Sequence, residues 1–136
     1  MYEVFEHTAD LGLRIRAADL NTLFADAGRG MFSIIAGDLT GVTPRQTQKF
    51  ALPGTEIDFL LFDWLNELLY AFESQRLLFV EFNVQVSAIG LQATASGEPW
   101  DPQRHRLEHE VKAITYHQLS VTHQDDGWLA EVILDI

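Results

Sequence analysis

Alternating apolar and polar residues predict two strands near the N-terminus. Leu11, Leu13 and Ile15 alternate with small or polar residues, which is typical of a strand with one buried face. A shorter run, 2–6, precedes it, and the polar residues 7–10 separate the two runs. Such a loop either presents side chains for catalysis or metal binding, or it is a turn whose polar side chains form hydrogen bonds with their own backbone.

The second half of the chain predicts further strands. Runs 80–87 and 91–96 alternate around a turn at Ile89-Gly90, and a strand at 118–123 is joined to one at 128–136 by the turn signal Asp125-Asp126-Gly127. A short strand is also expected at 49–52.

Two stretches have helical spacing. The first extends from Leu20 to about Ala36, with Asp19 as its cap and Gly37 as its stop. In the second, 56–73, with Thr55 as the expected cap, one broad arc is apolar. The opposite half of this helix combines acidic residues with three aromatic residues, Phe59, Phe62 and Tyr70. This half either contacts a partner or is covered by the protein's own loops or sheet.

These elements predict an α+β fold. We expect two amphipathic helices packed on a mixed or antiparallel β-sheet, in a single two-layer domain covering residues 1–136. The pattern leaves the order of the strands open.

The amino-acid composition excludes several classes of function. The chain is 47% apolar and contains no Cys, which excludes disulfides, thiol catalysis and Cys-ligated zinc sites. No apolar run is long enough to span a membrane and no signal peptide is visible, so we expect a cytoplasmic protein.

The charge is strongly acidic. Twenty Asp and Glu oppose nine Lys and Arg, a formal charge of −11, which disfavours direct, tight binding of nucleic acid. An acidic surface suits a divalent cation or a basic partner surface, or it serves solubility alone.

The last two residues form a candidate cation site. The side chain of Asp135 and the α-carboxylate of Ile136 place anionic oxygens together at the end of an expected strand, where a divalent cation would stabilise them. Asp10 is the best further ligand if the first and last strands are neighbours, with His7 and Thr8 as its hydrogen-bonded frame. Alternatively, both carboxylates lie in water.

Evidence for an independent enzyme is weak. Lys112, Tyr116 and His117 offer acid–base groups, but no nucleophile has an evident base. The expected role of Lys112 is therefore an ion pair, either internal or across an interface. His105 and His109 are four residues apart but lie in a Pro- and Arg-rich loop, which disfavours a zinc site.

At four stretches the sequence resembles the archease family. They occur in family order along the whole chain: His7-Thr8-Ala9-Asp10-Leu11-Gly12, 63–70, Glu110-Val111-Lys112-Ala113-Ile114-Thr115-Tyr116-His117, and Val132-Ile133-Leu134-Asp135-Ile136. The 110–117 octet together with the terminal Asp-Ile is specific to that family.

The resemblance implies a non-catalytic accessory protein of the RtcB-type RNA ligase, which joins RNA ends in tRNA splicing and RNA repair. Members promote guanylylation of the ligase and its multiple turnover. The implied metal is Ca²⁺, with Mg²⁺ or Mn²⁺ as alternatives, bound by Asp10, Asp135 and Ile136. Lys112, His7 and His117 are candidates for ligase activation. A metal-dependent hydrolase acting alone and a general chaperone or scaffold are the rival functions.

Overall fold

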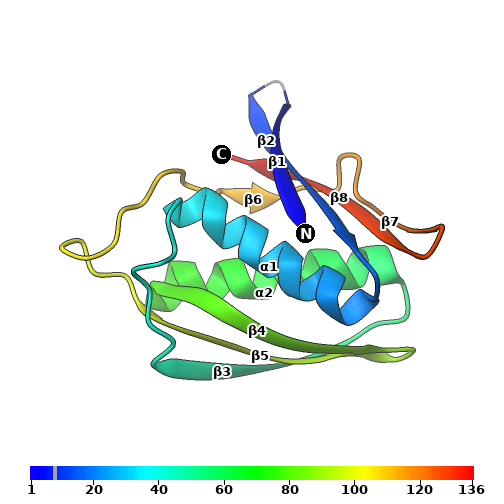
Figure 1. Ribbon diagram of the computed structural model, residues 1–136, viewed down its shortest axis with the longest axis horizontal. Helices are drawn as coiled ribbons and strands as arrows, with labels where there is room; N and C mark the ends of the chain where they lie inside the picture. The colour runs from blue at the N-terminus through cyan, green and yellow to red at the C-terminus, as the bar shows by residue number, and fades with distance from the viewer. Residues whose placement is uncertain (8) are drawn as a thin grey trace.

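Two helices lie between two antiparallel sheets in the computed structural model, which describes residues 1–7 and 9–136 (Figure 1). The α+β class, the two helices and the single domain agree with the sequence-based prediction. The number of layers differs, because each helix contacts both sheets. Sheet, helices and second sheet therefore form three layers, and the expectation of one sheet in a two-layer domain is corrected.

The first sheet joins the two ends of the chain. Its order is β1-β2-β8-β6, with β7 also paired to β8, so the last strand lies directly beside the second. Its strands are β1 (Tyr2–His7), β2 (Asp10–Ala17), β6 (Ala113–Ile114), β7 (Ser120–Gln124) and β8 (Gly127–Asp135). The paired strands are antiparallel throughout.

The second sheet has the order β3-β5-β4 and is also antiparallel. Each strand is longer than the alternation predicted: β3 is Gln46–Pro53, β4 is Leu77–Ser87 and β5 is Gly90–Pro99. Strands β3 and β5 continue through polar residues, glycine and proline beside each apolar run, whereas β4 begins three residues earlier, at Leu77-Leu78-Phe79, which are apolar.

Helix α1 (Leu20–Ala36) begins and ends as predicted. Asp19 caps it by accepting a 2.8 Å hydrogen bond from the Thr22 N–H, and Gly37 ends it with a positive φ of 72°, which glycine adopts readily. Helix α2 (Ile57–Gln75) is capped by Glu56, without a side-chain hydrogen bond, rather than by Thr55. The Leu60 N–H donates to the Glu56 carbonyl at 2.9 Å, so the first helical bond starts one residue later than expected.

Two glycines allow α1 to fit between the sheets. A Cβ at Gly28 would lie 2.8 Å from the Phe82 ring of β4, whereas one at Gly30 would lie 2.5 Å from Leu13 of β2. The two glycines thus face opposite sheets. Their cost to helix stability, about 1 kcal/mol each relative to Ala, is offset by this close packing.

The aromatic residues on the acidic half of α2 have two different environments. Phe62 stacks on Tyr116, from the segment between β6 and β7, with ring centroids 4.0 Å apart. Phe59 and Tyr70 remain exposed. The protein's own loop therefore covers one of the three.

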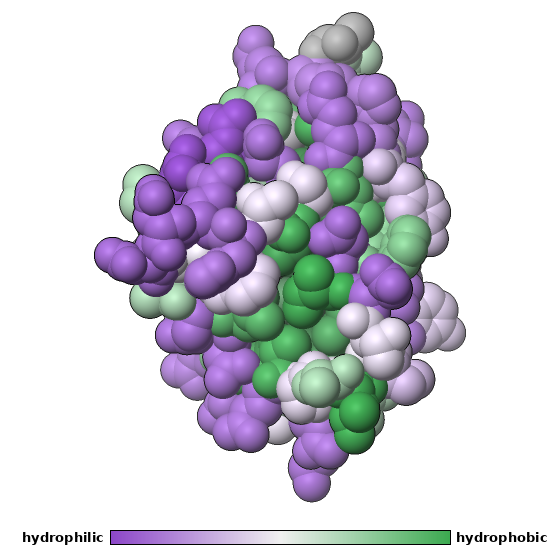
Figure 2. All heavy atoms as spheres, turned by 90° about the vertical axis from the view of Figure 1, so that its right-hand side faces the viewer, coloured by the Kyte–Doolittle hydropathy of each residue, from purple (hydrophilic) through white to green (hydrophobic). Residues whose placement is uncertain are grey.

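The end of the molecule where both helices begin carries an apolar strip surrounded by polar residues (Figure 2). A shallow hollow there is lined by apolar residues of both helices, β4 and β8, among them Leu20, Ile57, Leu60, Val86 and Trp128. The core thus reaches the surface at this end.

Candidate functional site

The predicted site residues meet at one end of the first sheet. His7 pairs with Asp10 in the β1–β2 ladder, and Asp135 pairs with Ala113 in the β6–β8 ladder. The last β2–β8 pair is Leu11 with Leu134, so Asp10 and Asp135 follow it at opposing positions. His7, Asp10 and Asp135 therefore form a row across three strands.

This row belongs to the outer face of the sheet. Leu11, Leu13 and Leu134 point into the core or towards it, and alternate residues point the other way. Side chains at opposing positions of antiparallel strands share one face. The carboxylates of Asp10 and Asp135 are consequently neighbours on the side away from the helices, and both residues are half-buried.

Residues 112–117 border the row on the far side of β8. The Lys112 N–H donates to the Asp135 carbonyl at 2.7 Å, and the Thr115 N–H donates to the Ile133 carbonyl at 3.0 Å. The His117 N–H donates to Oγ1 of Thr115 at 3.2 Å. These bonds hold the 112–117 segment against the end of β8.

The two candidate histidines lie together. The ring centroids of His7 and His117 are 5.3 Å apart, although the residues are far apart in sequence. Nδ1 of His7 is buried and has no hydrogen-bond partner among the described residues. The end of the sheet therefore combines two imidazoles with two carboxylates.

Gly12 and Phe5 fix the N-terminal hairpin next to this row. The Phe5 ring lies across Gly12, where a Cβ would approach it to 2.1 Å. The Arg14 guanidinium lies 4.6 Å from the centre of the same ring and is paired with Glu3 and Glu131 on the neighbouring strands. These hydrogen bonds raise the pKa of Arg14, that to Glu3 most. The outer face beside the site is thus packed and charge-paired.

Oxygen and imidazole groups of this kind can coordinate a divalent cation. Asp10 and Asp135 fit the implied cation, because the cross-strand register places two carboxylates side by side. Within residues 1–7 and 9–136, however, no three His, Asp or Glu side chains are arranged as a complete metal site. The predicted third ligand, the carboxylate of Ile136, is a backbone group and lies next to Asp135.

The sequence also made predictions for Lys112 and Thr8. No ion pair joins Lys112 to a carboxylate in the part of the chain that the structure describes, so the internal alternative for its role is not formed. Thr8, the expected frame of Asp10, lies outside the described residues.

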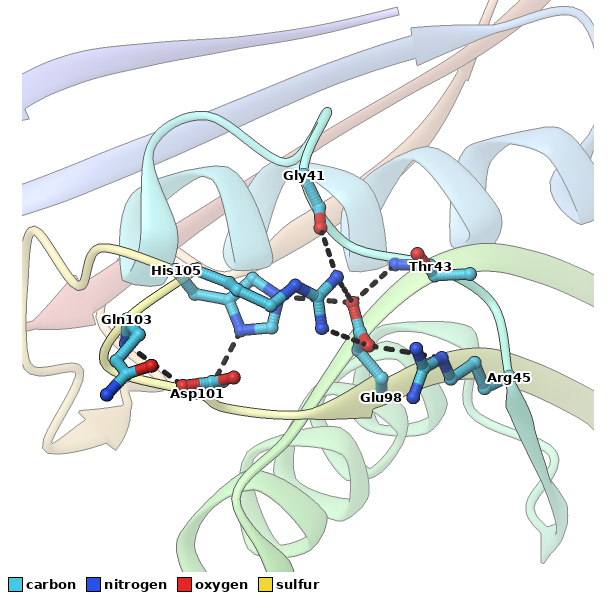
Figure 3. Close-up of polar contacts among 8 residues, drawn as sticks. Gly41, Thr43, Arg45, Glu98, Asp101, Gln103 and His105 are labelled. Atoms are coloured by element: carbon cyan, nitrogen blue, oxygen red, sulfur yellow. Dashed lines mark hydrogen bonds and ion pairs between the residues drawn. The ribbon is translucent and has the colours of Figure 1, made fainter.

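A second polar cluster, which the sequence did not reveal, surrounds Glu98 at the end of β5 (Figure 3). The Glu98 side chain is 2% exposed and accepts hydrogen bonds from Arg104 at 2.9 and 3.0 Å. It also accepts from the Thr43 N–H at 2.7 Å and contacts Nε2 of His105 at 3.1 Å. The bonds from Arg104, Thr43 and His105 lower the pKa of Glu98 to about 2.

The Glu98 cluster is a structural brace. Nδ1 of His105 accepts from the Asp101 N–H at 2.9 Å, so both ring nitrogens of the histidine are engaged within the protein. Arg104 additionally donates to the Gly41 carbonyl at 3.2 Å. The cluster joins the loop before β3 to the loop after β5. Its only sequence signal was a Glu at a strand end, followed six residues later by Arg-His.

Comparisons with known proteins identify relatives along the whole chain. The model of the Archease protein family matches residues 2–136. The chain is 38% identical to protein archease of Methanosarcina acetivorans, covering 99% of this chain and 95% of the relative. It is 35% identical to protein archease of Methanopyrus kandleri, covering 99% of both.

Solved structures agree with the fold. The solution structure of protein 1598 of Methanobacterium thermoautotrophicum superposes with a TM-score of 0.88 at 32% identity, covering 99% of this chain and 98% of that one. A Thermotoga maritima crystal structure, of an archease described as a possible chaperone, gives a TM-score of 0.67 at 20% identity, covering 100% and 98%. None of the helices in the described chain has the length and apolar character needed to cross a membrane.

Proposed function

Because the chain belongs to the archease family, we propose that it is a non-catalytic, cytoplasmic accessory protein of an RtcB-type RNA ligase. It promotes guanylylation of the ligase and its multiple turnover in tRNA splicing or RNA repair. The observation that carries this proposal is the row of His7, Asp10 and Asp135, bordered by the 112–117 segment, at one end of the first sheet.

Asp10, Asp135 and the carboxylate of Ile136 are the proposed ligands of a divalent cation, Ca²⁺ in preference to Mg²⁺ or Mn²⁺. The opposing positions of the two Asp residues support this assignment. When bound, the cation would supply positive charge that offsets the repulsion between the carboxylates. It would also tie the β1–β2 hairpin to the end of β8.

The neighbouring side chains have separate proposed roles. Lys112 is held at the site by its backbone bond to Asp135, and its ammonium is available to a carboxylate or phosphate of the ligase complex. His7 and His117 shape the outer surface of the row, with Nδ1 of His7 able to accept or donate a further hydrogen bond.

The test is guanylylation of a purified RtcB-type ligase by GTP, with and without this protein. Stimulation by the unaltered protein is expected, together with its loss in Asp10→Asn, Asp135→Asn and a C-terminal extension after Ile136. Glu81→Gln is the matched control, because Glu81 is an exposed carboxylate on the other sheet. Full stimulation by the three altered proteins would refute the role of the row.

Lys112 requires its own comparison. Lys112→Ala is expected to lower the maximal stimulation, whereas Lys49→Ala, which removes a lysine from the second sheet, is expected to leave it unchanged. The two variants should melt at similar temperatures. If Lys112→Ala and Lys49→Ala stimulate the ligase equally, Lys112 is a surface lysine with no role in activation.

A general chaperone is the second candidate function. The exposed rings of Phe59, Tyr70 and Tyr116 favour it, and the Thermotoga maritima relative is described as a possible chaperone. Suppression of aggregation of unrelated unfolded proteins would support this alternative. Hydrolysis of RNA or phosphoesters by this protein alone would instead support an independent enzyme.

A further inference from the structure

The large exposed aromatic residues of the described chain lie on α2 or pack beside it. Phe59, Tyr70 and Tyr116 are 52%, 65% and 60% exposed. Phe59 and Tyr70 are eleven residues apart, which is close to three helical turns, so they lie on one line about 16 Å long. Exposed rings gathered on one element are typical of an interaction surface.

Tyr116 makes one end of this surface rigid. Its ring stacks on Phe62 at 4.0 Å and meets the edge of Phe59 at 5.7 Å. A shallow hollow beside these rings is lined by Asp58, Phe59, Tyr116 and Leu119. Since the rings are already fixed by one another, a partner that contacts them loses little side-chain entropy.

The charge on this side has one sign. Asp63 and Glu67 are exposed on the line between Phe59 and Tyr70, and α2 contains four acidic residues but no Lys or Arg in its 19 residues. A like-charged partner would be repelled, and a basic one would be attracted over several ångströms. The complementary surface therefore carries Lys or Arg side chains around an apolar depression.

The same surface continues into the candidate site. Tyr116 is flanked by Thr115, which bonds to Ile133 of β8, and by His117, whose ring lies beside His7. A partner that binds at Tyr116 therefore also lies next to the end of the first sheet that carries the row of carboxylates.

We propose that Phe59, Asp63, Glu67, Tyr70 and Tyr116 form the docking face for the ligase, opposite a basic patch on that enzyme. This inference rests on the proposed function. It separates two tasks: the docking face on α2 provides affinity, and the row at the end of the first sheet provides activation.

The test measures binding and activation separately. Binding of fluorescently labelled protein to the ligase is followed by anisotropy, and stimulation of guanylylation is titrated in parallel. The double variant Phe59→Ala/Tyr116→Ala is expected to weaken binding about tenfold or more, as for aromatic residues at interface centres. It should raise the half-maximal concentration equally without changing the maximal stimulation. Asp10→Asn should lower the maximum and keep the affinity.

Two controls sharpen the test. Ile89→Ala removes an apolar side chain that is 78% exposed at the β4–β5 turn, and it should leave binding unchanged. Asp63→Lys/Glu67→Lys should weaken binding and reduce its salt dependence between about 50 and about 500 mM, whereas Glu81→Lys on the second sheet should have a smaller effect. Circular dichroism checks that each variant is folded.

The outcomes distinguish the two proposals. If Phe59→Ala/Tyr116→Ala binds the ligase as tightly as the unaltered protein does, the proposed docking face is wrong. This holds whether or not stimulation of guanylylation is normal. An unaltered protein that binds through this face but does not stimulate guanylylation overturns the proposed function and supports the docking face. If the same residues bind unrelated unfolded proteins, the proposal that this face is specific for the ligase is wrong.

Discussion

Replacing Trp64 by Phe tests how the two helices are held together. Trp64 is completely buried in α2, and its Nε1–H donates to the Phe24 carbonyl of α1 at 3.0 Å. Its ring meets Phe50 edge-on at 5.3 Å. The indole therefore links both helices and the second sheet.

Three effects contribute to the expected loss of stability. The lost hydrogen bond costs about 1 kcal/mol, because the Phe24 carbonyl keeps its helical partner. The smaller ring buries less apolar surface, which costs about 1 kcal/mol. It also leaves roughly 40 Å³ of space, worth about 1 kcal/mol more. Together they predict a decrease of about 3 kcal/mol in the free energy of unfolding.

Urea denaturation followed by far-ultraviolet circular dichroism measures this change, and a thermal melt should shift by about 10 °C. Trp100→Phe is the matched control, because Nε1 of Trp100 is buried without a hydrogen-bond partner among the described residues. Removing that unpaired donor is expected to be neutral or stabilising. Equal destabilisation by the two substitutions would refute the assigned role of the Trp64–Phe24 bond.

Three further predictions concern the brace, the hairpin and the cation. Glu98 has a pKa lowered to about 2 in the folded protein, so its stabilising contribution is present above its ordinary pKa and is lost as the pH falls towards 2. Between pH 5 and pH 2 the unaltered protein should therefore lose more stability in urea titrations than Glu98→Gln. Gly12→Ala displaces the Phe5 ring and should cost about 1–3 kcal/mol, measured by the same denaturation. Ca²⁺ at about 100 times its dissociation constant should stabilise the protein by about 2.7 kcal/mol, a gain absent from Asp10→Asn.

Each of these has a specific control. Parallel pH profiles of the unaltered protein and Glu98→Gln would contradict the lowered pKa. Gly41→Ala, where a Cβ comes no closer than 3.6 Å to the nearest neighbouring atom recorded, is the steric control for Gly12→Ala. A Ca²⁺-dependent gain that persists in Asp10→Asn would move the cation site away from the row.

Local sequence signals predicted the elements that depend on near neighbours. Asp19 and Gly37 mark the bounds of α1, and the turn at 125–127 joins β7 to β8, because caps and tight turns need only a few adjacent residues. The cap of α2 was placed one residue early, since Thr55 is the better capping residue but the backbone enters the helix after Glu56.

The sequence singled out some, but not all, of the polar residues that the structure brings together. Asp10 and Asp135 were singled out from the sequence, and their opposing positions depend on β2 pairing with β8, a contact between the two ends of the chain. The Glu98 brace was missed, because a buried carboxylate is recognised by its donors, and Thr43 is 55 residues away.

The sequence by itself determined the helices, most of the strands and the acidic charge, because periodicity, capping and composition are properties of short segments. It also supplied the candidate residues of the row. Only the tertiary structure decided that two sheets enclose the helices and that Tyr116 covers Phe62 while Phe59 stays exposed. It also decided that His7 meets His117. These outcomes depend on which faces pack together across long separations in the chain, and hydrophobic burial, being non-directional, does not specify the partner from the pattern alone.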